Sequence, residues 1–451
     1  MARLHGVMTR RTFTQVGSLA LLGGLGARAQ PTASNRVRVA AVFTVLRFRS
    51  HAFNILENMF GPYLFRGEQH APRVEIVSMY ADQRPKDDMS REVGQRFGVP
   101  VFKTIEEALC VGGTSLACDA VLLIGEHGEY PFNDRGQHLY PRKQFFDQAV
   151  GVMERQNRFV PIFNDKHLSY RWDWAEQMYG TARRYGIPML AGSSVPLAER
   201  RPLLELPAEP EFDEAVAIHG GGFESYDFHG LELLQSMVES RRGGESGIAE
   251  VELLSGEAYE QAKNRRWSQT LVEAALAAEK NAGARRQPRP TGGVMTPAAG
   301  PRVELPHPRG PYAICVKYQD GFRGTVLSLS GGSDRWLFAA KLRGESEPRA
   351  ASWYNGPWGN RCLFMALTHA IEHLFVHRQE PYPLERTLLT TGALEASVRS
   401  YHEHRAIATP HLARAYRASD WSAFRENGAS WRLIDPDKPQ PLKIESRRFP
   451  S

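Results

Sequence analysis

The sequence predicts an α/β fold followed by an α+β fold: an N-terminal Rossmann-like, doubly wound parallel sheet, then a C-terminal domain with a large open antiparallel sheet. Two observations predict it. In residues 36–195, apolar runs alternate with helical stretches at steps of about 20 to 40 residues, which is typical of a parallel sheet with helices on both faces. In residues 196–430, apolar runs follow one another without regular helices between them, which is typical of antiparallel strands.

The elements of the first domain are predicted from short apolar runs and amphipathic stretches. Its strands are predicted at 37–43, 74–80, 99–102, 119–125, 159–163 and 188–192. Its helices are predicted at 51–60, 90–97, 105–109, 142–154 and 170–185. Because the carboxyl ends of parallel strands meet at one edge of the sheet, a ligand is expected at that edge.

The second domain is predicted to be mainly sheet, closed by two helices. Its strands are predicted at 214–219, 247–254, 312–317, 324–330 and 336–341, and its helices at 362–376 and 384–402. Residues 282–310 are rich in Pro, Gly, Ala and Arg, which favours a flexible surface excursion, and residues 431–451 are expected to form a tail. An antiparallel sheet with one open face usually finds a cover, so a homo-oligomer is expected.

Composition and charge exclude several classes of protein. The chain has 451 residues, of which 42% are apolar and 24% charged, which is the composition of a multi-domain globular protein. Residues 1–29 hold four arginines and no carboxylate, and without them 52 basic residues face 50 acidic ones. A nearly neutral body with no dense Lys/Arg stripe argues against a nucleic-acid partner.

The N-terminus resembles a twin-arginine export signal spanning residues 1–29. Arg10 and Arg11 precede Phe13, a weakly apolar run follows over 16–26, and Ala27-Arg28-Ala29 provides a cleavage site. The apolar run is too short to span a bilayer, so no membrane span is expected in the mature protein. Recognition by the twin-arginine export machinery predicts a periplasmic or extracellular protein.

Cysteine usage gives no sign of a metal or redox motif. The four cysteines form no Cys-x-x-Cys pair. Buried free thiols are expected, with a disulfide between Cys110 and Cys118 as the alternative.

Short motifs follow one another along the chain in a characteristic order. They are Phe97-Gly-Val-Pro100, Ile105-Glu-Glu-Ala-Leu109, Asp119-Ala-Val-Leu-Leu-Ile124, Asn164-Asp165-Lys166-His167, Phe228-His229-Gly-Leu-Glu232, Pro383-Leu-Glu-Arg386 and Thr409-Pro410. In this order they resemble the glucose-fructose oxidoreductase / inositol dehydrogenase (Gfo/Idh/MocA) family over most of residues 36–415. The family resemblance also implies subunit pairing through the open sheet.

The resemblance implies catalytic roles for Lys166 and His229. In the family, the Lys polarises the substrate hydroxyl or carbonyl, and the His acts as general acid/base beside a nicotinamide ring. Hydride leaves a carbinol carbon only when the hydroxyl proton is removed, which needs a base near neutrality and a cation for the growing oxyanion. Without the resemblance, Lys166 would be interpreted as a solvated loop lysine and His229 as a core histidine.

The turn after the first strand departs from the family pattern. The family has a Gly-x-Gly-x-x-Gly turn against the pyrophosphate, whereas residues 44–51 contain no glycine. NAD or NADP is expected to meet these side chains instead: Thr44, Arg47, Arg49, Ser50, Asp82 and Glu126. Asp82 favours the ribose hydroxyl of NAD, while Arg84 favours NADP. Binding of a dinucleotide and loss of that binding both remain open.

Imidazoles and carboxylates gather where the central strands are expected to end. A sugar is the expected ligand, and the residues expected to bind it are His127, His138, Asp165, His167, Asp227 and Glu232. Such a set also suits a divalent metal, but its spacing matches no metal motif, so no metal is predicted. His369, His373 and His377 repeat every four residues on one helix and are interpreted as packing residues.

These observations predict an exported oxidoreductase that performs NAD(P)-dependent hydride transfer on a sugar, polyol or related carbohydrate. The missing glycine turn supports an alternative. In that alternative the chain has lost dinucleotide binding and acts as a carbohydrate-binding protein or as a metal-assisted or hydrolytic enzyme.

Overall fold

The computed structural model describes residues 36–282, 305–435 and 443–444. The predicted signal at 1–29, most of the excursion at 282–310 and most of the tail at 431–451 lie outside the described residues. Residues Arg36–Ser451 form one compact unit. The boundary predicted near residue 195 therefore stays a prediction.

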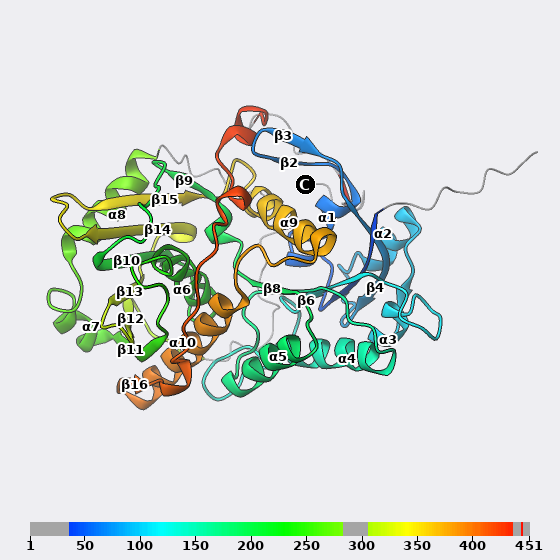
Figure 1. Ribbon diagram of the computed structural model, residues 1–451, viewed down its shortest axis with the longest axis horizontal. Coiled ribbons are helices and arrows are strands. Elements are labelled where there is room, and N and C mark those ends of the chain that lie inside the picture. The colour runs from blue at the N-terminus through cyan, green and yellow to red at the C-terminus, as the bar shows by residue number, and fades with distance from the viewer. Residues whose placement is uncertain (1–35, 283–304, 436–442, 445–451) are drawn as a thin grey trace, which may run out of the picture. The chain divides into compact units, whose positions relative to one another are not determined.

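The first sheet confirms the predicted Rossmann-like topology (Figure 1). Its strands are β1 (Val37–Phe43), β4 (Val74–Ala81), β5 (Val101–Phe102), β6 (Ala120–Ile124), β7 (Ile162–Asp165) and β8 (Met189–Gly192). They are all parallel and lie in the order β5-β4-β1-β6-β7-β8. In sequence order this is the 3-2-1-4-5-6 arrangement of a dinucleotide-binding fold.

Helices cover both faces of this sheet. They are α1 (His51–Phe60), α2 (Ser90–Phe97), α3 (Ile105–Leu109), α4 (Arg142–Arg155) and α5 (Trp172–Arg184). Alternate residues of β1 belong to different cores: Val39, Ala41 and Phe43 pack with α1 and α2, while Ala40 and Val42 pack with α3, α4 and α5. Burial on both sides explains why this strand is a continuous apolar run.

A small hairpin that the sequence analysis did not predict follows α1. It consists of β2 (Tyr63–Phe65) and β3 (Glu68–His70). Its two turn residues, Arg66 and Gly67, have φ of 51° and 84°. Two positive φ values in a two-residue loop are those of a type I′ turn, which matches the twist of the paired strands.

The second sheet is mixed, which corrects the expectation of purely antiparallel pairing. Its strands are β9 (Glu199–Arg201), β10 (Phe212–Gly220), β11 (Ile248–Ser255), β12 (Tyr312–Tyr318), β13 (Arg323–Ser328), β14 (Gly332–Leu342), β15 (Arg349–Tyr354) and β16 (Ile407–Ala408). The order is β16-β11-β12-β13-β10-β14-β15-β9, and β10 and β13 are parallel. The β11–β12–β13 meander lies on one side of β10 and the β14–β15 hairpin on the other, which brings β10 and β13 together in the same direction.

Helices cover this sheet more fully than an open face implies. They are α6 (Ser225–Val238), α7 (Gly256–Ala262), α8 (Gln269–Asn281) and α10 (Leu384–Glu403), whereas α9 (Asn360–His377) packs against α1 and the β2–β3 hairpin. Leu271 and Ala275 of α8 belong to one buried cluster with Val216 of β10 and Leu337 of β14. No helix in the described ranges is both long and apolar enough to cross a membrane.

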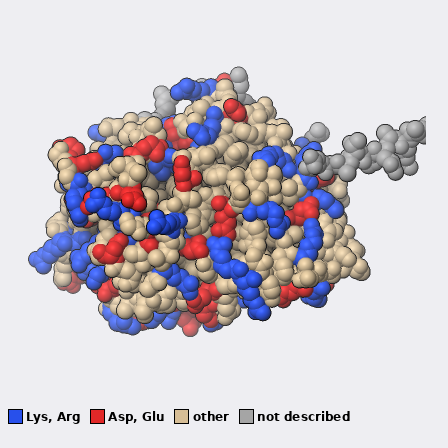
Figure 2. Space-filling view, in the orientation of Figure 1, with Lys and Arg blue, Asp and Glu red and all other residues tan. Residues whose placement is uncertain are grey.

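The visible face of the molecule carries charges of both signs. Figure 2 shows Lys and Arg interspersed with Asp and Glu over the visible face. Cys110, Cys118, Cys315 and Cys362 are all free thiols. His369 stacks on Phe65 with ring centroids 4.2 Å apart, which fits the packing role expected for this histidine.

Candidate functional site

The candidate site lies at the carboxyl edge of the first sheet, where α6 of the second half meets it. Lys166 follows β7, and its backbone pairs with Gly192 at the end of β8. Ser193 comes next and reaches His229 on α6. The fold therefore brings together the two residues for which the resemblance implied catalytic roles.

Lys166 is held as a buried cation. Its Nζ lies 3.5 Å from Oε1 of Glu126 and donates to the Ser225 hydroxyl at 3.2 Å. Its exposed fraction is 4%. A buried ammonium beside a carboxylate and a hydroxyl is fixed in place, so it is suited to hold a negatively charged oxygen.

His229 is a neutral imidazole. Its Nδ1 shares a 2.6 Å hydrogen bond with the Ser193 hydroxyl. Burial, followed by the nearby charge of Lys166, holds the pKa of His229 well below its ordinary value. The low pKa leaves a lone pair on the ring at neutral pH that can accept a proton, although it makes His229 a weaker base than an exposed histidine.

Glu126 connects the cations of the site. It forms a 2.5 Å ion pair with Arg142 of α4 in addition to its contact with Lys166. Burial alone would raise the pKa of Glu126, but the charges of Lys166 and Arg142 outweigh it and hold this pKa well below its ordinary value. Arg142 also donates to Nε2 of His167 at 2.9 Å.

Glu224 is a second buried carboxyl group, and its pKa is shifted in the opposite direction to that of Glu126. Burial raises its pKa to about 7, although the charge of Arg142 opposes the shift. Its Oε2 accepts from the backbone amide of His138, while Oε1 is buried without a hydrogen-bond partner. Nδ1 of His167 and Nε of Arg142 are also buried and unpaired. Such orphaned atoms in one cluster point to a polar group or water between them.

Sequence reasoning missed His51, the first residue of α1. Its Nδ1 lies 2.6 Å from Oδ2 of Asp165, and its backbone amide donates to Nδ1 of His127 at 3.3 Å. Burial, followed by the charge of His51, lowers the pKa of His127 to about 3. The signal that could have found His51 was its position at the same sheet edge as Asp165, although the two lie 114 residues apart.

Backbone strain gathers around this cluster. Arg49, His127, Lys166 and Glu224 all have φ between 63° and 70°. Non-glycine residues rarely adopt such values, which cost about 1 to 3 kcal/mol each and concentrate at functional sites. Gly192 is required for a related reason, because at its φ of +122° a Cβ would lie 2.7 Å from Oε2 of Glu232.

The residues expected to bind a dinucleotide already have protein partners. Thr44 donates to the carbonyl of Glu126, and Arg49 donates to the carbonyl of Trp358. Ser50 caps α1 by accepting from the amide of Phe53. The remaining contacts are an ion pair of Arg47 with Asp87 and hydrogen bonds to Asp82 from Tyr80 and Tyr130.

These contacts give a fit test for the pyrophosphate of NAD or NADP. A glycine-rich turn binds it through free amides at the helix N-terminus. Here the imidazole of His127 and the hydroxyl of Ser50 already accept two of the first amides of α1, and Thr44, Val45 and Leu46 are fully buried. The turn therefore does not fit a pyrophosphate bound in the usual way.

The residues expected to bind substrate lie in three different surroundings. His127, Asp165 and His167 lie in the cluster just described. Asp227 is fully buried between His219 and Tyr312, and Glu232 is fully buried and accepts from Thr390. His138 lies on the loop after β6, stacked on Phe132 with ring centroids 3.9 Å apart. Among the described residues, no group of three or more His, Cys, Asp or Glu side chains is arranged to hold a metal ion.

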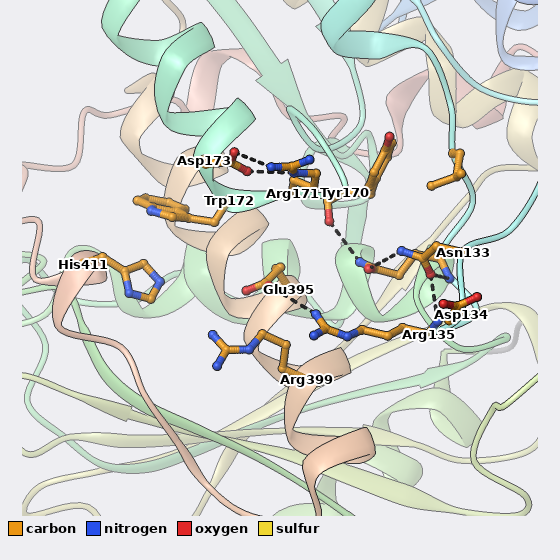
Figure 3. A pocket seen from close by; sticks show the side chains of 12 residues that line it. Asn133, Asp134, Arg135, Tyr170, Arg171, Trp172, Asp173, Glu395, Arg399 and His411 are labelled. Carbon is orange, nitrogen blue, oxygen red and sulfur yellow. Dashed lines mark hydrogen bonds and ion pairs between the residues drawn. The ribbon is translucent and has the colours of Figure 1, made fainter.

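A separate depression of about 730 Å³ lies between the loop after β6, the start of α5 and α10 (Figure 3). Arg135, Trp172, Glu395, Arg399 and His411 line it from these elements and from the chain after β16. None of Glu126, Lys166 and His229 belongs to its lining. The depression is therefore distinct from the polar cluster around Glu126, Lys166 and His229.

Comparisons with known proteins identify the fold. No protein-family model matches the sequence, and no curated protein matches it either. Among solved structures, GenD2 from gentamicin A biosynthesis in complex with NAD has a TM-score of 0.52 at 13% identity, covering 83% of this chain and 96% of its own. Scyllo-inositol dehydrogenase from Lactobacillus casei with bound NAD(H) and scyllo-inositol has a TM-score of 0.50 at 11% identity, covering 83% and 99%. Myo-inositol 2-dehydrogenase from Lactobacillus plantarum has a TM-score of 0.50 at 8% identity, with the same coverage.

Proposed function

We propose that this chain, which has the fold of the Gfo/Idh/MocA-type dehydrogenases, is an enzyme that acts on a hydroxyl-bearing or carbonyl carbon of a sugar, polyol or related carbohydrate. The observation that carries the proposal is the pairing of Lys166 and His229 at the carboxyl edge of the first sheet. Each is buried, and each is fixed by a partner of its own, Glu126 and Ser193. Open α/β sheets bind their ligands at this edge.

The two residues divide the chemistry between them. The Lys166 ammonium holds the substrate oxygen as negative charge develops on it, which stabilises an alkoxide or enolate. The neutral His229 imidazole takes up a proton and returns it. Glu126 orients Lys166 and supplies its counter-charge, because a buried ammonium without one is costly.

The hydride step separates two forms of this proposal. Oxidation of a carbinol carbon needs NAD or NADP as hydride acceptor, and the fold supports that form. The turn between β1 and α1 supports the second form, a redox-neutral member of the fold, because its first amides are taken by His127 and Ser50. Export by the twin-arginine route and a homo-oligomer belong to both forms of the proposal.

Ligand binding tests the proposal independently of the hydride step. Saturation-transfer NMR against a panel of monosaccharides and polyols should detect a ligand with the wild-type protein. Lys166→Met and His229→Asn should each weaken its binding at least tenfold. Two variants far from the site are the matched controls. Lys263→Met changes a surface lysine that pairs with Glu260, and His404→Asn changes the exposed end of α10. Unchanged binding in both site variants would overturn the proposal.

A further inference from the structure

We propose that the His51–Asp165 pair is a catalytic dyad, and that it makes this chain a redox-neutral enzyme that moves a proton on the carbon next to the carbonyl of a hydroxy-carbonyl sugar. The inference rests on the proposed function, since it uses the same Lys166–His229 site. It adds a second base beside His229, one that acts on a carbon-bound proton, and it removes the need for a dinucleotide.

The hydrogen bond to Asp165 fixes the tautomer of the His51 ring. A carboxylate only accepts hydrogen bonds, so the 2.6 Å contact with Oδ2 of Asp165 places the proton of His51 on Nδ1. Among the described residues, Nε2 of His51 has no hydrogen-bond partner, and it is not one of the fully buried unpaired atoms. The ring therefore presents a lone pair at Nε2, while Asp165 fixes its tautomer and stabilises the proton it gains.

Packing and burial hold both members of the dyad in place. Asp165 is 2% exposed, and the His51 ring packs edge-on against Phe364 and His127 with ring centroids 4.7 and 5.0 Å away. The backbone of His51 is anchored as well, because its amide donates to His127. A base held on all sides in this way is pre-organised for proton transfer.

The dyad lies between the start of α1 and the end of β7. His51 is the first residue of α1, the helix whose N-terminus meets the pyrophosphate in dinucleotide-binding folds. Asp165 immediately precedes Lys166 at the end of β7. The dyad thus stands beside the Lys166 cation and at the position where the dinucleotide would approach. The Lys166 ammonium and a protonated His51 would each disfavour a proton on His229, which agrees with one shared site.

The chemistry balances without an oxidant or reductant. Nε2 of His51 takes the proton from the carbon next to the carbonyl, and the C–H electron pair forms a C=C bond. The carbonyl π pair moves onto oxygen, where the Lys166 ammonium holds the enolate. His229 shuttles the hydroxyl proton, and return of a proton to either carbon of the enediol gives an isomer, an epimer or the starting sugar.

Deuterium exchange tests the dyad directly. The wild-type protein, without added dinucleotide, is incubated in D2O with D-fructose, D-glucose and 2-keto-myo-inositol, and deuterium at the carbon next to the carbonyl is measured by NMR. Incorporation into at least one compound is expected, with a loss of at least 100-fold in His51→Asn and full retention in His404→Asn. Absence of exchange with all three compounds overturns the proposal.

A second variant guards against a folding defect at His51. Asp165→Asn keeps the shape of the side chain but removes its negative charge and offers a donating amide in place of one carboxylate oxygen, so kcat for exchange should fall by about 10²- to 10⁴-fold with little change in KM. Exchange that needs Lys166 and His229 but survives in a folded His51→Asn protein overturns the dyad and leaves the proposed function standing. Exchange unaffected in Lys166→Met and His229→Asn overturns both.

Discussion

At the scale of single residues, the site is a balance of buried charges. Glu126 lies within contact distance of both Lys166 and Arg142, and all three are nearly inaccessible to water. Removing one member of such a set leaves a buried charge without its counter-charge, which costs about 3 to 5 kcal/mol. Stability and chemistry therefore depend on the same side chains.

Glu126→Gln tests this balance. The folded-state pKa of Glu126 lies below its ordinary value, so its contribution to stability is present above about pH 4.5 and is lost as the pH falls further. The variant should lose about 3 to 5 kcal/mol of unfolding free energy at pH 7. Between pH 5 and pH 3, the unfolding free energy of the variant should also fall by less than that of the wild type. Urea unfolding at both pH values measures this, and an equal acid sensitivity of the two proteins would count against the charge balance.

Glu224 should show the opposite pH dependence. Its folded-state pKa of about 7 lies above its ordinary 4.5, so the folded chain keeps a proton that the unfolded chain releases. Stability contributed by this proton is lost as the pH rises from 4.5 to 7. Glu224→Gln should therefore flatten the fall in Tm between pH 5 and pH 8. The control Glu257→Gln, at an exposed position of α7, should leave the profile unchanged.

Sequence reasoning reached some of these residues and missed others for a physical reason. Lys166 and His229 were accessible because they occur in motifs that resemble a family. His51 looked like the start of a helix, since its partner Asp165 is distant in sequence and only the fold brings the two together. The partners of Glu126 and the raised pKa of Glu224 follow from burial, which a sequence does not display.

At the scale of elements, strands and helices with strong local signals were predicted well. The helices predicted at 51–60, 90–97 and 105–109 have these same bounds in the structure. The β2–β3 hairpin was missed because each strand has only three residues. Trp353 lies within β15 and is 1% exposed, because pairing with β9 rather than local sequence decides its conformation.

Gly192→Ala tests the close approach between β8 and α6. A Cβ there would lie 2.7 Å from Oε2 of Glu232 and 2.8 Å from Oγ1 of Thr387, at a φ of +122°. Overpacking and strain should destabilise the variant by about 1 to 3 kcal/mol. Gly186→Ala, also at positive φ but with no atom within 4 Å of the added Cβ, is the control and should lose only about 1 to 2 kcal/mol. Equal losses in urea unfolding would show that the contact with Glu232 is unimportant.

At the scale of the whole molecule, buried ion pairs join elements far apart in the chain. Arg361 of α9 donates to Glu57 of α1, and Arg386 of α10 pairs with Glu239 at the end of α6. Both pairs are almost fully buried. They hold α9 to α1 and α10 to the end of α6, and so help to fix the two halves that carry Lys166 and His229.

Arg361→Met should therefore act on the whole unit. Loss of the guanidinium removes a buried counter-charge of Glu57, so the free energy of unfolding should fall by about 3 to 5 kcal/mol. Unfolding should remain a single cooperative transition. The double variant Arg361→Met/Glu57→Gln should recover part of the loss. Arg343→Met, which breaks an exposed pair with Glu211, should cost less than about 1 kcal/mol. A separate early transition for residues near α9 would instead indicate that this helix is not part of the cooperative unit.

The expected homo-oligomer also belongs to this scale. It was predicted from an open sheet face, and α8 covers part of that sheet. Light scattering coupled to size-exclusion chromatography measures the assembly.

The claim that the turn between β1 and α1 carries no dinucleotide is tested most directly by native mass spectrometry. The purified protein is measured alone and after addition of NAD and NADP, with small molecules released by denaturation identified in the same run. The arrangement of His51, His127 and Ser50 predicts an unmodified mass in all three samples. A stoichiometric dinucleotide adduct, whether carried through purification or formed on addition, would contradict it and return NAD(P)-dependent oxidation of a sugar or polyol as the function of this chain.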